Sequence, residues 1–182
     1  MKKIVAVFGS ARVQPDSDVY VQSYEIGKAL AQAGYVTMTG GYAGVMEAAS
    51  RGANEANGEV QGITVESLEY IGESRVNQWV REEIRYATLP ERVRHLVDKA
   101  DAYIVMPGGL GTIQELVEVW QGMRLGDVPH RPLILYGNFW HPLIENLLDG
   151  GYISERDLRY VIETAKPKGI INALEDWFTR ET

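Results

Sequence analysis

The chain has 182 residues, of which 45% are hydrophobic and 24% are charged, values typical of one globular domain with a sizeable core. Its net charge of −7 argues against non-specific nucleic-acid binding, which needs a basic surface. The sequence contains no cysteine, so disulfides are excluded and a zinc site would have to use histidines and carboxylates.

Short apolar runs alternate with helical patterns along the chain, as is typical of a parallel sheet covered by helices. We expect strands at residues 3–8, 35–39, 60–65, 83–87, 102–106, 132–136 and 159–163. Helices are expected at 17–33, from the turn at 40–44 to about 57, and at 90–99, 112–124, 139–148 and 170–178. Residues 66–78 lack periodicity and are expected to form a long loop. The sequence therefore predicts an α/β fold for residues 1–182, a single Rossmann-like, doubly wound domain with a mostly parallel sheet.

The apolar runs of the sequence indicate no membrane span, and the spacing of its histidines indicates no metal site. No apolar run approaches the roughly 20 residues of a membrane span, and the run at residues 4–8 is too short for a signal peptide. We expect a cytoplasmic protein. His95, His130 and His141 show no metal-ligand spacing, so neither a metal nor a resident cofactor is expected.

Three of the predicted strands lead into glycine-rich turns, at residues 9–12, 40–44 and 107–112. In open parallel sheets, ligands bind beyond the carboxyl ends of the strands. Glycine leaves the backbone uncovered there, and the free N–H groups of the following helix attract an anion. The third turn is the most informative, because Gly108, Gly109 and Gly111 are followed by the hydroxyl of Thr112. We expect a phosphate to bind at this turn.

Two well-known nucleotide motifs are absent. The second turn lacks the G-x-G-x-x-G register, which would need glycine where Thr39 stands, and no Gly-Lys-Ser/Thr motif of a P-loop occurs.

The residues after the third turn allow two interpretations. Thr112 and Glu115 have the spacing of a capping box, in which Thr112 caps the helix and Glu115 bonds back to its amide. Glu115 could equally be a functional carboxylate, and the local pattern leaves both open.

The full motif at residues 107–115 resembles the LOG family, named for the plant Lonely Guy proteins. Its pattern P-G-G-x-G-T-x-x-E is matched at every position. The resemblance extends to residues 8–10, 41–46, 100–102 and 151–153, and so through most of the chain. It implies a phosphoribohydrolase that releases a cytokinin or adenine base from a nucleoside 5′-monophosphate.

The resemblance also implies roles for individual residues. Glu115 would stabilise positive charge on the ribose and hold a water, as carboxylates do in glycoside hydrolysis. Arg92 matches the arginine of the family's M-x-x-R-K stretch, although Leu89 and Val93 replace Met and Lys. The phosphate would rest on residues 108–112, and four more residues would flank the ligand: Ser10, Gly41, Gly44 and, next to the base, Met46.

Alternatives remain for these residues and for the function. Met46 could simply pack in the core, and Arg92 could form a surface ion pair of little value. The same scaffold could be a non-catalytic carrier of a nucleotide or of the molybdenum cofactor. Lysine decarboxylase, a label often attached to this family, would need a lysine placed to bind pyridoxal phosphate, and none stands in the turns. The family resemblance further implies a homodimer.

Overall fold

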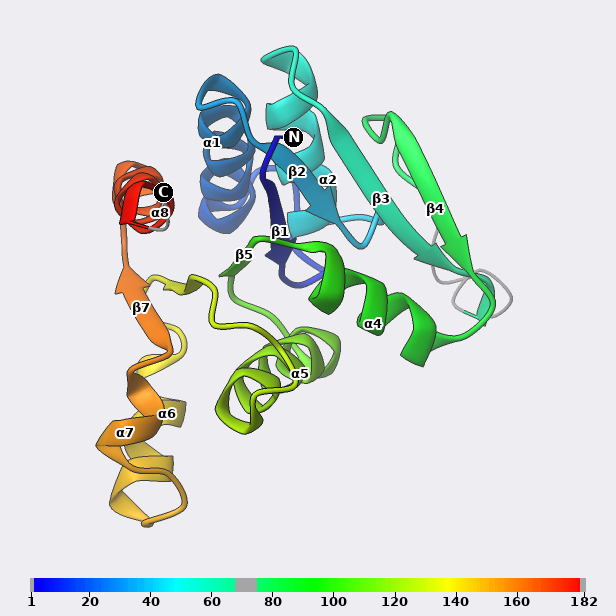
Figure 1. Ribbon diagram of the computed structural model, residues 1–182. Coiled ribbons are helices and arrows are strands. Elements are labelled where there is room, and N and C mark those ends of the chain that lie inside the picture. The colour runs from blue at the N-terminus through cyan, green and yellow to red at the C-terminus, as the bar shows by residue number, and fades with distance from the viewer. Residues whose placement is uncertain (1, 68–74, 181–182) are drawn as a thin grey trace.

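A seven-stranded parallel sheet forms the centre of the computed structural model, which describes residues 2–67 and 75–180 (Figure 1). The strands are β1 (Ile4–Phe8), β2 (Val36–Thr39), β3 (Val60–Val65), β4 (Glu82–Tyr86), β5 (Ala102–Val105), β6 (Leu133–Tyr136) and β7 (Val161–Thr164). Their order is β4-β3-β2-β1-β5-β6-β7, and all neighbours are parallel. The predicted α/β, doubly wound fold is therefore confirmed.

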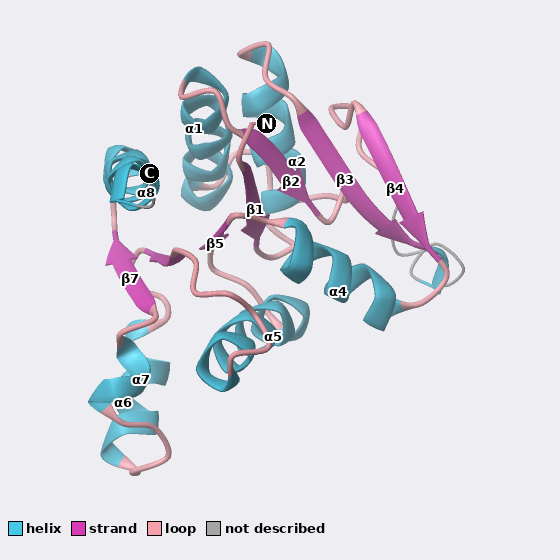
Figure 2. Ribbon diagram, viewed as in Figure 1, coloured by secondary structure: helices cyan, strands magenta, loops and turns pink. Residues whose placement is uncertain are grey.

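Helices cover both faces of this sheet (Figure 2). They are α1 (Asp18–Gln32), α2 (Val45–Glu55), α4 (Leu89–Lys99), α5 (Leu110–Leu125), α6 (His141–Asp149), α7 (Glu155–Leu158) and α8 (Pro167–Arg180). Within the described residues, none of the helices has the length and apolar content needed to cross a membrane.

The two layers of helices follow from the alternation of side chains along the buried strands. In β1, Val5 and Val7 face the hydrophobic cluster built with α1, α2 and α8. Ala6 and Phe8 face the opposite cluster, to which α4, α5 and α6 contribute. Because both faces of the strand are covered, its sequence is a continuous apolar run.

The strand order reverses direction between β1 and β5. From β1 the sheet extends through β2 and β3 to one edge, and from β5 through β6 to the other. A crevice beyond the carboxyl ends of the strands is expected at such a point. The turns after β2, β1 and β5 are the three glycine-rich turns, and they are neighbours along this edge.

Several element boundaries differ from the prediction. α5 begins at Leu110 and not at residue 112, the short helix α7 was not predicted, and α8 begins three residues earlier than expected. Of the predicted loop at 66–78, residues 66–67 are helical, 75–78 are irregular, and 68–74 lie outside the described residues.

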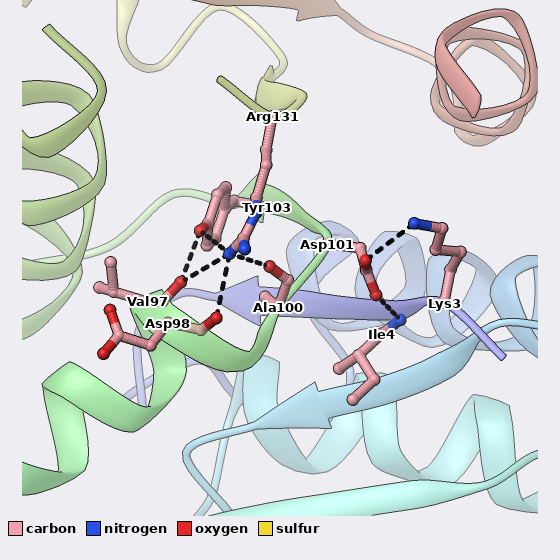
Figure 3. A network of polar contacts seen from close by, with 8 residues as sticks. All are labelled: Lys3, Ile4, Val97, Asp98, Ala100, Asp101, Tyr103 and Arg131. Carbon is pink, nitrogen blue, oxygen red and sulfur yellow. Dashed lines mark hydrogen bonds and ion pairs between the residues drawn. The ribbon is translucent and has the colours of Figure 1, made fainter. Parts of the chain in front are cut away.

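Arg131 anchors the carboxyl end of α4, the helix that contains Arg92 (Figure 3). Its Nη1 donates hydrogen bonds to the carbonyl oxygens of Val97, Asp98 and Ala100, and contacts the Tyr103 hydroxyl. The last carbonyl groups of a helix have no intrahelical partner, and a cation there is favourable. This contact fixes α4 against the sheet.

Asp101, the residue that leads into β5, ties the start of this strand to β1 (Figure 3). Its carboxylate accepts a hydrogen bond from Ile4 N at 2.8 Å and pairs with Lys3 Nζ at 3.0 Å. The two central strands are therefore joined at their amino ends as well as through the ladder.

Candidate functional site at the carboxyl edge of the sheet

The turn after β5 presents the unpaired amide groups of a helix start. Gly109 is the N-cap of α5 and makes no side-chain cap. The first intrahelical bond runs from Ile113 N to Gly109 O at 2.9 Å, so the amides of Leu110, Gly111 and Thr112 precede it. These three N–H groups and the helix dipole form a ready anion site.

The capping-box interpretation of Thr112 is wrong. Thr112 lies inside the first turn of α5 and not at its N-cap, so its side chain cannot cap the helix in that way. It is buried instead against Gly108, where an added Cβ atom would overlap the Thr112 hydroxyl. The Glu115 carboxylate is thereby free of the Thr112 amide and turns towards α4.

Ser10 joins the turn after β1 to the other two turns. Its amide donates to Pro107 O at 3.1 Å, and its carbonyl accepts from Val45 N at 3.0 Å. Its hydroxyl oxygen accepts from Arg12 N at 3.1 Å. Ser10 therefore lies between the start of α2 and the predicted phosphate turn.

The second turn is shaped by two glycines in the left-handed region. Gly41 has φ of 80° and Gly44 has φ of 65°, a region that favours glycine. Gly44 is the N-cap of α2, so Met46 lies in the first turn of that helix. Met46 is buried, but it belongs to neither hydrophobic cluster of the described chain, and its sulfur lies beside Gly40.

Arg92 and Glu115 form a buried pair one helical turn beyond the amide groups. Arg92 Nη1 lies 3.5 Å from Glu115 Oε1. Arg92 is only 6% exposed, so its interpretation as a surface ion pair is wrong. Burial raises the pKa of Glu115 to about 7, although the Arg92 cation acts to lower it. Burial is therefore the larger of the two effects on this carboxyl group.

Such a pair has the properties of a functional site. A carboxyl group with a pKa raised to about 7 and an arginine are both held next to a candidate anion site, and they are the buried charged residues of the part of the chain that the structure describes. The arrangement can stabilise positive charge, position water and bind an anion.

Sequence reasoning missed three residues that shape this site: Gly40, Tyr42 and Asn77. A Cβ atom on Gly40 would overlap Arg92 Nη2 and crowd the Met46 sulfur. The Tyr42 ring lies 5.7 Å from Arg92 Cζ. Asn77 Nδ2 donates to the carbonyl oxygens of Gly41 and Tyr42 at 3.1 and 2.8 Å. The sequence offered one signal, a second glycine before Gly41.

The histidines take no part in this arrangement. His95 Nδ1 bonds to the Tyr86 hydroxyl at 2.7 Å, and His130 packs edge-on against Tyr160 and Trp177. Over residues 2–67 and 75–180, no three acidic or histidine side chains gather in a way that could hold a metal ion.

Comparison with known proteins places the chain in a family. The family model described as "Possible lysine decarboxylase" matches residues 46–174. A Mycobacterium tuberculosis protein named cytokinin riboside 5′-monophosphate phosphoribohydrolase is 28% identical over 155 residues, which cover 82% of this chain and 81% of the relative. An Arabidopsis thaliana relative with the same enzyme name is 31% identical over 140 residues, which cover 75% of this chain and 60% of the plant protein. The chain thus matches less than two thirds of that plant relative.

Among solved structures, the molybdenum cofactor binding protein from the phototrophic bacterium Rippkaea orientalis has the same fold. It superposes with a TM-score of 0.76 at 25% identity, over 98% of both chains. Since the family model covers well over half of the sequence and the P-G-G-x-G-T-x-x-E motif is complete, this chain belongs to the "Possible lysine decarboxylase" family, that of the LOG proteins.

Proposed function

We propose that this chain is a phosphoribohydrolase acting on a purine nucleoside 5′-monophosphate, either AMP or a cytokinin-type nucleotide. The reaction breaks the bond between ribose C1′ and the base. Water supplies the hydroxyl group that joins C1′, and the base leaves with a proton, giving free base and ribose 5-phosphate. The observation that carries this proposal is the buried Arg92–Glu115 pair, one helical turn beyond an anion site.

The glycines of the third turn support a phosphate there. Gly109 and Gly111 have no neighbour within 4 Å of an added Cβ atom, and neither has a positive φ. The fold alone therefore does not require glycine at either position. Gly109 is the N-cap, where glycine is itself favoured over alanine. At Gly111, inside the helix, glycine costs up to about 1 kcal/mol relative to alanine, and a ligand that approaches the bare backbone would account for it.

In the proposed mechanism, Glu115 acts as a carboxylate next to C1′. Positive charge develops on the sugar as the glycosidic bond breaks, and an ionised carboxylate stabilises it and holds the attacking water. A positioned acid–base group typically contributes about 10²–10⁴-fold in rate. Arg92 stays protonated at neutral pH, so it serves as an electrostatic clamp and not as a proton donor.

The remaining predicted residues would surround the nucleotide. Gly108, Gly109, Gly111 and Thr112 would hold the phosphate, and Ser10 with the Gly41–Gly44 turn would flank the ribose. Met46 would contact the base from the first turn of α2. The hydrogen bonds that join Ser10 to Pro107 and Val45 support this grouping.

The test is base release from AMP. Pure protein is incubated with AMP, and adenine and ribose 5-phosphate are measured by chromatography. We expect release by the wild type and by Glu25→Gln, a control at an exposed glutamate on α1, but a loss of at least about 100-fold in Glu115→Gln. Release that survives unchanged in Glu115→Gln would refute the catalytic assignment.

A carrier function is the second candidate, because a solved structure that covers 98% of this chain is named a molybdenum cofactor binding protein. The molybdenum cofactor ends in a phosphate monoester, which the same helix start would accept. A carrier would bind AMP or the cofactor tightly and release no adenine in the same assay.

We also propose that the protein forms a homodimer through α5. This helix presents an apolar stripe at helical spacing, formed by the exposed side chains Leu110, Ile113, Val117 and Leu125. A groove of about 530 Å³ runs beside it between α4 and α5. Exposed apolar rows of this kind are typical of protein interfaces, and a second copy of the same helix is the occupant that the stripe fits best.

A further inference from the structure

The floor of the candidate site lies where β2 stops pairing with β3. The two strands pair in parallel register up to Thr39, opposite Gly62, and Thr37 N donates to Glu59 O at 3.0 Å. Bonds of a parallel ladder recur at every second residue. The next bonds would therefore join Gly41 N to Ile63 O, and Val65 N to Gly41 O.

Two side chains replace these missing bonds. Ile63 O accepts a hydrogen bond from Arg92 Nε at 2.7 Å. Val65 N donates to the Tyr42 hydroxyl at 2.8 Å, and that hydroxyl donates to Val65 O at 3.1 Å. Arg92 and Tyr42 thus take neighbouring places along the same stretch of β3.

The backbone of Gly41, which leaves the ladder, finds other partners. Gly41 N donates to Thr39 Oγ1 at 3.1 Å. Gly41 O accepts from Asn77 N at 2.8 Å and from Asn77 Nδ2 at 3.1 Å. Since buried backbone groups are costly to leave unpaired, this set of bonds specifies one arrangement of the turn.

The position of Arg92 is thereby fixed from three sides. Its Nε is bonded to Ile63 O, its Nη1 contacts Glu115, and its guanidinium lies over the Tyr42 ring with Cζ 5.7 Å from the centroid. A cation within about 6 Å of an aromatic centroid is attracted to the ring. Tyr42 is itself 2% exposed, with its hydroxyl bonded to Val65, so its place is below the site and not in contact with a ligand.

We infer that Tyr42 is a positioning residue, which holds the guanidinium of Arg92 against Glu115 by bridging the second turn to β3. The kinetic consequence of this inference rests on the proposed function. Its structural consequence does not, because the Arg92–Glu115 contact exists without a substrate.

The ionisation of Glu115 reports on this contact. Among the described groups, Arg92 is the cation that acts on Glu115, and it lowers the pKa of the carboxyl group. Burial raises that pKa. If Arg92 is released from its place, its attraction to the carboxylate weakens and the pKa of Glu115 rises further.

The experiment is a carboxyl titration of protein labelled with ¹³C-glutamate, with the Glu115 signal assigned by its absence in Glu115→Gln. Tyr42→Phe removes both hydrogen bonds to Val65. We expect the Glu115 midpoint to rise by at least ~0.5 pH unit in this variant. The matched control is Tyr20→Phe, since Tyr20 is also a buried tyrosine, with its hydroxyl 3.4 Å from Glu47 on α2. The Glu115 midpoint in Tyr20→Phe should equal that of the wild type.

Enzyme kinetics supply the second readout. With AMP as substrate, Tyr42→Phe should lower kcat by about 10-fold or more and leave KM within about 3-fold, because the ligand contacts stay in place. If Tyr42→Phe does not fold, Asn77→Ala takes its place, since Asn77 holds the carbonyl groups of Gly41 and Tyr42. It should raise the Glu115 midpoint in the same direction.

The outcomes separate this inference from the proposed function. A Glu115 midpoint that stays at the wild-type value in folded Tyr42→Phe, or in Asn77→Ala where that variant replaces it, overturns the positioning role. If the midpoint rises in Tyr42→Phe but the wild-type protein itself releases no adenine from AMP, the positioning role is supported and the proposed enzyme activity alone is overturned.

Discussion

Arg92 Nη2 occupies the space in which residue 40 would carry a Cβ atom, so Gly40 and Arg92 are complementary in shape. Gly40 is not among the glycines with positive φ, and its backbone conformation does not demand glycine. The buried guanidinium accounts for the residue. An arginine on α4 therefore determines the residue type of a turn more than fifty positions earlier in the chain.

Gly40→Ala should displace Arg92 from both Ile63 O and Glu115. Inserting a methyl group into packed surroundings costs about 1–3 kcal/mol of unfolding free energy, and we expect a loss in this range by urea denaturation. Release of adenine from AMP should fall by at least about 100-fold, since an electrostatic contact is lost. Full activity in a folded Gly40→Ala protein would show that Arg92 is not needed at this position.

Gly111→Ala, in contrast to Gly40→Ala, should keep the stability of the protein and weaken the binding of its ligand. An added Cβ atom meets nothing within 4 Å, and alanine favours the helix by up to about 1 kcal/mol, so stability should hold or rise. Binding of AMP to the Glu115→Gln background, measured by calorimetry, should weaken at least about 10-fold, because the methyl group stands beside the amides that would hold the phosphate. Unchanged affinity would place the phosphate elsewhere.

The alternation of elements was predictable because both faces of most strands are buried. Runs such as residues 102–106 contain apolar residues throughout, and turns rich in glycine mark where they end. The start of β7 was predicted two residues too early and its end one residue too early, because its partly buried residues alternate less clearly. The short helix α7 was missed because four residues show no period.

The candidate site could be predicted from the sequence only where neighbouring residues form a motif. Residues 107–115 lie on one strand–turn–helix unit, so the pattern itself brings them together. The local rule for Thr112 and Glu115 failed because the helix starts two residues earlier, and a partner on α4 takes up the carboxylate. Gly40, Tyr42 and Asn77 were missed because their roles depend on the register in which β2 leaves β3.

If the proposed dimer forms through the apolar stripe of α5, one substitution on that stripe should dissociate it. Val117→Lys should convert the dimer to a monomer in light scattering, because a buried charge at an interface is costly. Val21→Lys is the control, since Val21 on α1 and Val117 are both 53% exposed. The dimer proposal is wrong if the wild type is monomeric, or if both variants remain dimers at low micromolar concentration.

The pKa of Glu115 predicts how stability depends on pH. With a folded pKa of about 7 against an ordinary value of 4.5, the folded state holds the proton more tightly than the unfolded state. The wild type should therefore lose unfolding free energy relative to Glu115→Gln as pH rises from about 4.5 to 7, by about 3 kcal/mol at most. The difference should then stay constant above pH 8. A difference that is flat over this range would mean that the pKa of Glu115 is not raised in the folded protein.

The same ionisation predicts the pH profile of the proposed reaction. Glu115 stabilises a developing cation only as a carboxylate, so kcat/KM for AMP, which reports ionisations of the free enzyme, should rise with pH, reach half its limit near pH 7 and level off above pH 8. The AMP phosphate also titrates in this range, and Glu115→Gln separates the two effects because it retains the phosphate site and removes the carboxyl group. Its residual rate should lack the rise near pH 7. If the variant keeps that rise, the ionising group belongs to the substrate, and Glu115 is not the carboxylate that the reaction uses.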